Sequence, residues 1–511
     1  MQRAHLATPS VLLLARLEDA LARARSAARR SGRPVLAWAS APAPAADPVT
    51  LFARAEGLVT TRLLWARPAD DLSIVGLGVA WEVVAGGDRR FATAGEAWRR
   101  CLAQSCGAGD VHGPVALGGF AFAPQVVQQP AWAAFPPGLL VVPALTVRTQ
   151  GAHMEAILSV LVPPEGEEAP RRAVEQLAAL LAPDDPTQPV APPGAGPGRR
   201  TGLVGSHHTG DAPAAGTPGD VGSPRRLRQR TASLAEEHPP AAIWKALVAD
   251  AAAAVQRGEL RKVVLARAVT VDGIGVDATS ALRRLQVGYP DCTLFAVARG
   301  DTCFLGATPE RLLRVRDGMV ATGALAGSAP RGTTPDDDQR RGEALLASPK
   351  DRIEHAVVVD AIREAMVAAC AEVAVAAAPR LLRVSNVQHL YTPVQGRLRD
   401  RYGLLDLAGR LHPTPAVGGV PRDAALAWIT AREGFERGWY AGPVGWVDAT
   451  GDGELAVAIR SALLCGSRAT LFAGCGIVAD SDPDAEYAES CLKLRPLAEA
   501  LEAPAALSGC R

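Results

Sequence analysis

Runs of alternating or continuous apolar residues recur from the N-terminus to about residue 160 and predict β-strands. Clear examples lie at 72–78, 115–122 and 139–143. Runs of this length, rich in aliphatic and aromatic residues, are typical of buried strands. The Gly118-Gly119 pair lies inside the second run and lacks the spacing of a phosphate-binding loop. We therefore expect this glycine pair to belong to a core strand.

The second half of the chain predicts strands and helices together. Apolar runs at 261–267, 455–459 and 474–478 predict strands, of which the last ends in a glycine-rich turn. An amphipathic pattern predicts one helix from 241 to 257 and another running from about residue 348 into 357–360. The chain is thus expected to be of mixed α/β class.

A C-terminal helix is predicted to begin at Asp482-Pro483, since an Asp N-cap followed by Pro favours helix initiation. Glu486, Glu489 and Lys493 follow at helical spacing and therefore lie near one face. Two carboxylates and an ammonium on one face suit a carboxylate ligand bridged by a metal, because carboxylate oxygens bind hard cations. A solvated helix face with ordinary ion pairs is the alternative.

Lys262 enters an apolar strand, where a period of two places it on one face with Val264 and Ala266. Burial lowers the pKa of a lysine and allows it to act as a base near neutral pH. A lysine at the edge of a sheet that extends its amine to water is the alternative.

Glu310 follows Pro309 where a predicted strand ends in a turn. Apolar walls could keep its carboxyl protonated, so that it serves as an acid. The alternative is a surface carboxylate paired with Arg311.

Arg460 ends another apolar strand, and a guanidinium held by a rigid strand is a good carboxylate receptor. An ordinary structural ion pair is its alternative.

Glu354 lies one turn into the helix that begins near residue 348 and is a candidate second carboxylate for a metal. The neighbouring His355 is interpreted as structural.

Residues 184–238 are dominated by Pro, Gly, Ser, Thr and Arg, and apolar periodicity is nearly absent. We predict a disordered insertion there, with His207-His208 a flexible pair, between an N-terminal half (1–183) and a catalytic region (239–511).

Composition narrows the function classes. The 54 Lys and Arg balance 53 Asp and Glu, so bulk charge indicates neither nucleic-acid nor membrane binding. The apolar run at 11–14 is shorter than a signal sequence requires, and no stretch approaches the roughly 20 apolar residues of a membrane span. Nine cysteines without metal-type Cys-x-x-Cys pairs are expected in a reducing cytoplasm.

Over residues 240–498 the chain resembles the chorismate-utilising enzymes, which include isochorismate, salicylate, anthranilate and aminodeoxychorismate synthases. The resemblance rests on segments 261–267, 304–311, 348–360, 387–393, 412–415, 455–460 and 474–493, which follow the family's order and spacing. It implies an α/β fold of the α+β kind, with two large face-to-face antiparallel sheets and helices outside, as in anthranilate synthase component I.

The resemblance also implies the site. Glu354 and Glu489 would bind Mg²⁺, with Glu486 close by, and the metal would hold the ring carboxylate of chorismate. Further contacts to the substrate's carboxylates would come from Arg460, Lys493, the amides around Gly474 and Gly476, and the backbone of Gly327. His389 would lie near the leaving hydroxyl.

Individual positions favour the isochorismate synthase branch. Ammonia-using relatives typically carry Gln where Lys262 stands, and aminodeoxychorismate synthases carry a nucleophilic Lys where Ala326 stands. The segments 388–393 and 412–419, together with Tyr440, resemble isochorismate synthases, and the long N-terminal half resembles the menaquinone type.

The reaction implied is a reversible, Mg²⁺-dependent isomerisation of chorismate to isochorismate. Lys262 would deprotonate a water that attacks C2, and Glu310 would protonate the departing C4 hydroxyl. Two alternatives remain open at this point: a salicylate synthase, which goes on to eliminate pyruvate, and a non-catalytic chorismate-binding protein. No glutaminase subunit is expected, and a monomer is predicted.

Overall fold

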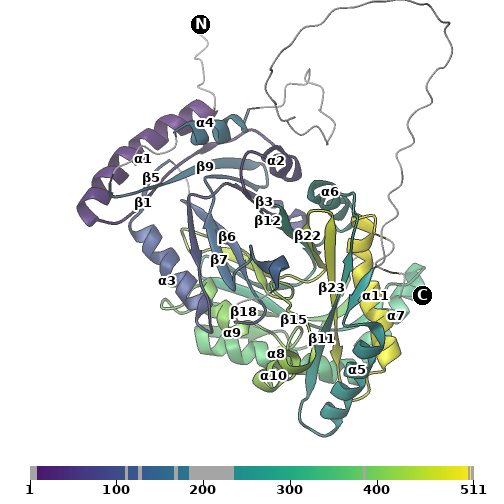
Figure 1. Ribbon diagram of the computed structural model, residues 1–511. Coiled ribbons are helices and arrows are strands. Elements are labelled where there is room, and N and C mark those ends of the chain that lie inside the picture. Colours follow the sequence, from purple (N-terminus) through teal and green to yellow (C-terminus); the bar gives the residue numbers. More distant parts are fainter. Residues whose placement is uncertain are drawn as a thin grey trace, which may run out of the picture. The chain divides into compact units, whose positions relative to one another are not determined.

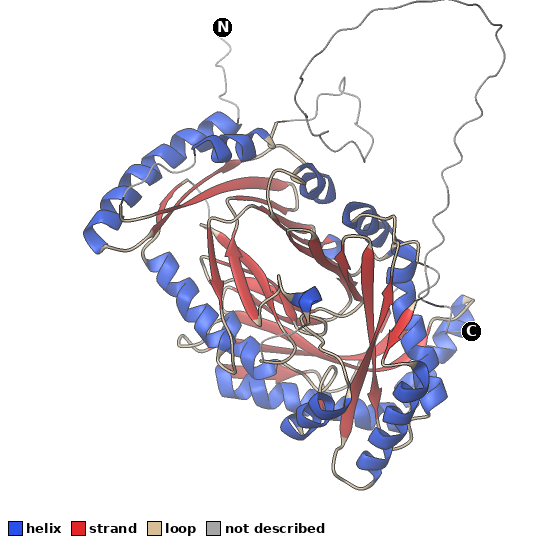
Figure 2. Ribbon diagram, viewed as in Figure 1, coloured by secondary structure: helices blue, strands red, loops and turns tan. Residues whose placement is uncertain are grey.

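The computed structural model describes residues 9–109, 113–124, 129–165, 171–182, 235–383, 387–503 and 507. Their strands form two large sheets, called sheet A and sheet B (Figures 1 and 2). In order across sheet A lie β10 (Glu236–His238), β11 (Lys262–Val271), β23 (Arg468–Ile477), β22 (Ser461–Cys465), β13 (Thr302–Thr308), β12 (Thr293–Arg299), β2 (Thr61–Arg67), β3 (Leu72–Leu77), β8 (Leu145–Gln150), β9 (His153–Val162), β1 (Val35–Pro42) and β5 (Cys106–Ala108), with β19 (Gly419–Val420) also paired to β11.

Sheet B is built from strands of both halves of the chain. In order across it lie β16 (Cys370–Val375), β18 (Val387–Leu398), β15 (Met319–Pro330), β14 (Arg311–Arg316), β21 (Gly453–Val457), β20 (Pro443–Asp448), β6 (Val115–Phe120), β7 (Gly138–Val142) and β4 (Trp81–Val84), with β17 (Arg380–Arg383) also paired to β18. Among the described strand pairs, only β1 with β5 is parallel. The predicted antiparallel architecture is therefore confirmed.

The α-helices lie outside the sheets (Figure 2), whereas Trp132 of a 3₁₀ turn belongs to the inner core. They are α1 (Pro9–Ser31), α2 (Pro48–Arg54), α3 (Arg90–Ala103), α4 (Arg171–Ala179), α5 (Ala241–Gln256), α6 (Ala278–Gly288), α7 (Pro335–Ala347), α8 (Pro349–Ala369), α9 (Leu404–Leu411), α10 (Arg422–Arg432) and α11 (Pro483–Ala500), with single 3₁₀ turns at Pro68–Asp70 and Pro130–Trp132. Among them, α11 packs on β23 of sheet A, and α8 packs on β15, β16 and β18 of sheet B. None of these helices combines the length and apolar character that a bilayer span requires.

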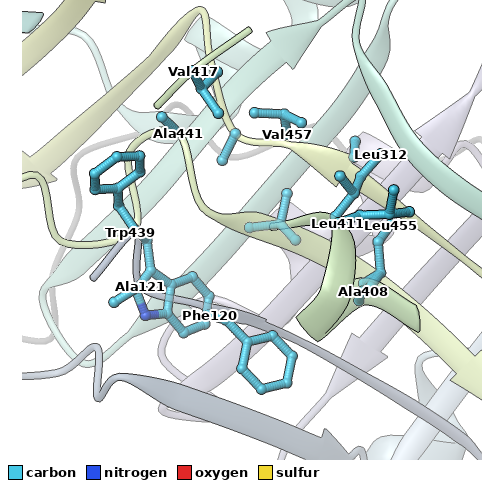
Figure 3. Close-up of a cluster of buried hydrophobic side chains, with 14 of the residues drawn as sticks. Phe120, Ala121, Leu312, Ala408, Leu411, Val417, Trp439, Ala441, Leu455 and Val457 are labelled. Atoms are coloured by element: carbon cyan, nitrogen blue, oxygen red, sulfur yellow. The ribbon is translucent and has the colours of Figure 1, made fainter. Parts of the chain in front are cut away.

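Alternating side chains of sheet A contribute to two separate hydrophobic cores. In β13, Phe304 faces the inner core, which also contains sheet B residues, whereas Leu305 faces the outer core beneath the helices. This is the period of two expected of a strand buried on both faces. Figure 3 shows part of the inner core, where Phe120 of sheet B lies near Trp439 and Leu455 of sheet B lies near Leu411. The two sheets therefore face each other across a shared apolar layer.

The predicted strands at 72–78, 115–122 and 139–143 are found as β3, β6 and β7. Gly118 and Gly119 lie within β6 and are buried. A Cβ on Gly119 would come within 2.5 Å of the Trp439 ring, so this glycine permits close packing between β6 and the inner core. The interpretation of the glycine pair as core is confirmed.

The predicted insertion at 184–238 lies largely outside the described residues, and so does the pair His207-His208. At the end of the predicted insertion, residues 236–238 form β10, which pairs with β11. Regular structure therefore begins slightly before the boundary expected near Pro239, because three residues suffice to extend the edge of sheet A.

Candidate active site

A cavity of about 260 Å³ brings together segments from both sheets and from α8 and α11. Every residue predicted for the site lines this cavity: Lys262, Glu310, Gly327, Glu354, His389, Tyr440, Arg460, Gly474, Gly476, Glu486, Glu489 and Lys493. The sequence placed these residues in separate motifs, and the fold collects them at one place.

One wall of the cavity is the face shared by β11 and β23. In the antiparallel register, Val264 lies opposite Gly476 and Ala266 lies opposite Gly474. Residues directly opposite in a sheet share a face, so the glycines lie beside the side chains of Val264 and Lys262. A Cβ on Gly476 would lie 2.7 Å from Lys262 Cε. The glycines therefore make room for the lysine.

The Lys262 amine is buried and oriented by a carboxylate. Its Nζ donates a hydrogen bond of 2.6 Å to Glu354 Oε1, and the two side chains are 5% and 17% exposed. Glu354 lies in the first turns of α8, whose N-cap is Ser348. An exposed edge lysine is therefore excluded, because the amine points into the cavity rather than to bulk water.

Glu310 lies in the turn after β13 and is buried. Burial raises the pKa of its carboxyl to about 7, although Lys262 and Lys493 act in the opposite direction. The alternative of a pair with Arg311 is wrong, since Arg311 bonds Glu454 and Asp70 instead.

Glu486, Glu489 and Lys493 lie on one side of α11, as the helical spacing predicted. Asp482 caps this helix by accepting a hydrogen bond of 2.8 Å from the Ala485 amide. Lys493 Nζ lies 2.8 Å from Glu489 Oε1 and donates to Gly474 O at 2.8 Å. All three residues line the cavity, and the Glu489 side chain, which is 42% exposed, also forms the i, i+4 ion pair with Lys493 that a solvated face would have.

The two carboxylates of α11 have different pKa values. Lys493 lowers the pKa of Glu489, whereas burial and the charge of Glu489 raise that of Glu486. One oxygen of each carboxylate and the Cys475 sulfur lie within 4.8 Å of one another. Burial raises the pKa of the Cys475 thiol, so the carboxylate oxygens are better donors for a hard cation than the sulfur.

Arg460 lies three residues beyond the end of β21, in a left-handed backbone conformation with φ of 51°. The sequence placed it at the strand end, and the extra residues turn its side chain into the cavity. Within the described part of the chain, its guanidinium makes no hydrogen bond or ion pair, so the alternative of a structural ion pair is wrong. Burial lowers its pKa. Its donors are therefore available to an anionic ligand.

His389, Gly327 and Tyr440 complete the lining. Ser328 Oγ lies 2.8 Å from His389 Nδ1, and burial lowers the pKa of this histidine to about 4, so it is neutral at pH 7. Gly327 forms a bulge in β15 with φ of +78°, which favours glycine. The Tyr440 ring stacks on Phe472 at 5.1 Å, and burial raises its pKa to about 12.

His355 is structural, as the sequence interpretation favoured. Its Nδ1 lies 3.2 Å from Ala326 O and its Nε2 lies 2.7 Å from Thr392 Oγ1, and the ring is buried. Both ring nitrogens are therefore engaged within the protein, and His355 does not line the cavity.

A family model for chorismate binding enzymes matches residues 20–192 and 220–502. The chain belongs to the chorismate binding enzymes. This family match covers both halves of the fold and spans every cavity residue described above.

Relatives within the family are similar to the chain over nearly its full length. A salicylate biosynthesis isochorismate synthase of Pseudomonas aeruginosa is 39% identical over 95% of this chain and 94% of its own. Isochorismate synthase MenF of Bacillus subtilis is 34% identical over 89% of this chain and 91% of its own. The solved structure of MenF, the menaquinone-specific isochorismate synthase of Escherichia coli, has a TM-score of 0.71 and 26% identity, and the match covers 95% of this chain and 99% of that chain.

The sequence interpretation missed other residues of this chorismate binding enzyme that line the cavity. Asp351 lies in the first turn of α8 and accepts from Ser348 Oγ at 2.5 Å. The Ser-x-x-Asp spacing is a helix-capping signature and would have found it. Arg437 also lines the cavity, paired with the buried Glu433. The two residues are only four apart in the sequence, but their contacts with β11 join distant parts of the chain and leave no local signal.

Proposed function

We propose that the protein is an isochorismate synthase that isomerises chorismate to isochorismate in the presence of Mg²⁺. The observation that carries the proposal is that a buried lysine, Lys262, and a buried protonatable carboxyl, Glu310, line one cavity. The isochorismate synthases named above support it, because they match this chain over at least 89% of its length.

Lys262 is proposed to be the general base. A lysine can accept a proton from water, which then attacks C2 of the ring, whereas a glutamine at this position could not. Glu354 holds the amine by the 2.6 Å contact and thereby fixes where the base lies. Gly476 leaves the space that the lysine occupies.

Glu310 is proposed to be the general acid. With its pKa raised to about 7, a substantial fraction of this carboxyl is protonated near neutral pH. It can therefore deliver a proton to the C4 hydroxyl as that group departs. Both proton transfers are balanced, since water loses a proton to Lys262 and the leaving hydroxyl gains one from Glu310.

The remaining cavity residues are proposed to hold the substrate. Arg460 presents unpaired donors suited to a carboxylate, and Lys493 adds positive charge beside it. The amides around Gly474 and Gly476 and the backbone of Gly327 would contact the same anionic groups. Neutral His389 and the Tyr440 hydroxyl would bond the ring hydroxyls and orient C2 toward Lys262.

The carboxylates fit a magnesium ion. Oxygen donors of Glu486 and Glu489 lie within 4.8 Å of each other, and Glu354 lines the same cavity. Burial, and after it the charge of Glu489, raises the pKa of Glu486, and a bound cation would offset both effects. When bound, Mg²⁺ would fix the ring carboxylate and withdraw charge from the ring.

Location and assembly are proposed on the sequence alone. We propose a cytoplasmic monomer that works without a glutaminase subunit, because water rather than ammonia is the nucleophile. The relatives' names include both salicylate and menaquinone synthesis, and the menaquinone type remains the prediction from the sequence.

Incubation of the purified protein with chorismate and Mg²⁺, followed by chromatography, tests the proposal. Parallel reactions contain an added isochorismatase or ammonia. An equilibrium mixture of chorismate and isochorismate is expected. Salicylate with pyruvate would instead indicate the salicylate branch, an ammonia-dependent amine would contradict the role of Lys262, and binding without turnover would indicate a non-catalytic protein.

A further inference from the structure

Strand β11, which begins with Lys262, is incompletely paired along one edge. Its other edge follows β23 from Val263 to Val271. On the incomplete edge, β19 pairs with residues 262–263 and β10 pairs with residues 268–270. The backbone at 264–266 therefore lies in a gap between two short strands, only two residues from Lys262.

Backbone groups in this gap are satisfied mainly by side chains. Val264 N donates to Gly418 O at 2.8 Å. Val264 O accepts from Arg437 Nη2 at 2.7 Å, and Ala266 N donates to Glu433 Oε1 at 2.7 Å. The indole of Trp244 donates to Ala266 O at 3.2 Å. Glu433 and Arg437 thus take the place of a neighbouring strand.

Glu433 and Arg437 form a bidentate ion pair. Arg437 Nε donates to Glu433 Oε2 at 2.6 Å and Nη2 donates to Oε1 at 2.6 Å, with both side chains 3% exposed. Four N–H donors of this guanidinium are engaged within the protein, in contrast to Arg460. Since a guanidinium has five N–H donors, Arg437 shapes the cavity wall and keeps at most one N–H for a ligand.

Two further cavity segments meet at Arg437. Its Nη1 donates to Val417 O at 3.0 Å, and its backbone carbonyl accepts from the Tyr440 amide at 3.0 Å. Its guanidinium also lies 4.2 Å from the centre of the Phe122 ring, which fixes the plane of the group. The side chain of Arg437 thus joins the segment around Val417 to strand β11, and its backbone carbonyl holds the turn at Tyr440.

We propose that Glu433 and Arg437 are positioning residues that hold β11, and with it Lys262, in register for proton abstraction. The inference rests on the proposed function, because it assigns the pair a role through the base. A buried ion pair is seldom retained for stability alone, since its desolvation offsets much of its attraction. Here the pair supplies hydrogen bonds that an apolar pair could not give to the strand edge.

The test is a double variant, Glu433→Gln with Arg437→Met, which removes both charges and leaves neither one buried alone. We expect kcat to fall about 10- to 100-fold, the scale of a small misplacement of a catalytic group, with KM rising by less. Amide exchange in the segment around residues 262–268 should become faster.

The chain offers a matched control. Arg148 pairs with Asp448 at 3.3 Å and lies 5.1 Å from the centre of the Trp446 ring, and none of the three lines the active-site cavity. The double variant Arg148→Met with Asp448→Asn should keep its kcat. The conservative Arg437→Lys should retain an intermediate kcat, because one amine cannot reach both Val264 O and Val417 O in a fixed plane.

Three results would overturn the inference: a folded Glu433→Gln/Arg437→Met enzyme with full kcat, unchanged exchange around 262–268, or an equal loss of kcat in the Arg148 control. If the charge-free variant does not fold, Arg437→Lys with wild-type kcat is the overturning result. A wild-type enzyme that makes a product other than isochorismate contradicts the proposed function instead. The ratio of variant to wild-type rates would still decide the positioning role.

Discussion

Lys262 on sheet A and Glu354 on the helix that packs on sheet B meet across the cavity at 2.6 Å. The contact joins the proposed base to a carboxylate proposed for the metal. Removal of either side chain is therefore expected to affect the other, and their effects on the rate should not add. Roles are best separated by measuring binding and turnover independently.

Lys262→Ala should reduce turnover by about 10²- to 10⁴-fold, the usual contribution of a general base. Binding of chorismate and Mg²⁺ should remain largely intact, because the proposed carboxylate receptors are elsewhere. Rates from product chromatography and affinities from calorimetry check both parts. Lys245→Ala, which removes a half-buried lysine paired with Asp484 outside the cavity, is the control and should leave turnover unchanged. Near-normal turnover in Lys262→Ala would remove the lysine from the mechanism.

Glu310 should govern the alkaline limb of the pH profile. Its carboxyl must be protonated to donate, and its pKa is raised to about 7 by burial. The protonated fraction therefore falls as pH rises through about 7, and kcat/KM should fall with it. Glu310→Gln cannot donate a proton and should lose about 10²- to 10⁴-fold in rate together with this limb. An alkaline limb that persists unchanged in Glu310→Gln would assign it to another group.

Glu489→Gln should weaken the dependence on Mg²⁺. Loss of a charged oxygen donor is expected to raise the Mg²⁺ concentration for half-maximal activity by about tenfold or more. Metal binding followed by calorimetry gives a readout independent of activity. Glu499→Gln changes an exposed carboxylate of the same helix and serves as the control. Superimposable Mg²⁺ titrations of Glu489→Gln and wild type would argue against a metal role.

Gly476→Ala should slow the reaction while leaving the fold intact. The added methyl would lie 2.7 Å from Lys262 Cε and 3.5 Å from Glu354 Oε1, so the flexible lysine has to shift. Displacement of the base on this scale is expected to cost about 10- to 100-fold in kcat. Gly275→Ala, where nothing lies within 4 Å of the new methyl, is the matched control. Equal rates for the two variants would show that the lysine's position is not critical.

Local sequence patterns were sufficient to predict where a residue lies when its placement depends only on its own strand or helix. The period of two placed Lys262 and Val264 on one face, and the register with β23 adds Gly474 and Gly476 to it. The Asp482 cap fixed the start of α11. These features follow from backbone geometry that neighbouring residues dictate.

Features that depend on tertiary contacts were not predictable. The contact of Lys262 with Glu354, and that of Glu433 with the β11 edge, join residues far apart in the sequence. The position of Arg460 depends on its own left-handed backbone conformation after β21, which the local sequence does not predict. The described strand at 236–238 is short and polar, so only its pairing with β11 reveals it.

The separation of two hydrophobic cores by sheet A has a practical consequence for changing the enzyme. Side chains such as Phe52 and Leu305 belong to the outer core, and the proposed catalytic groups lie on the opposite side of the sheet. Substitutions that improve packing beneath the outer helices can raise heat tolerance without altering the shape of the cavity. Directed evolution for stability and for substrate preference can therefore draw on different sets of positions and be combined afterwards.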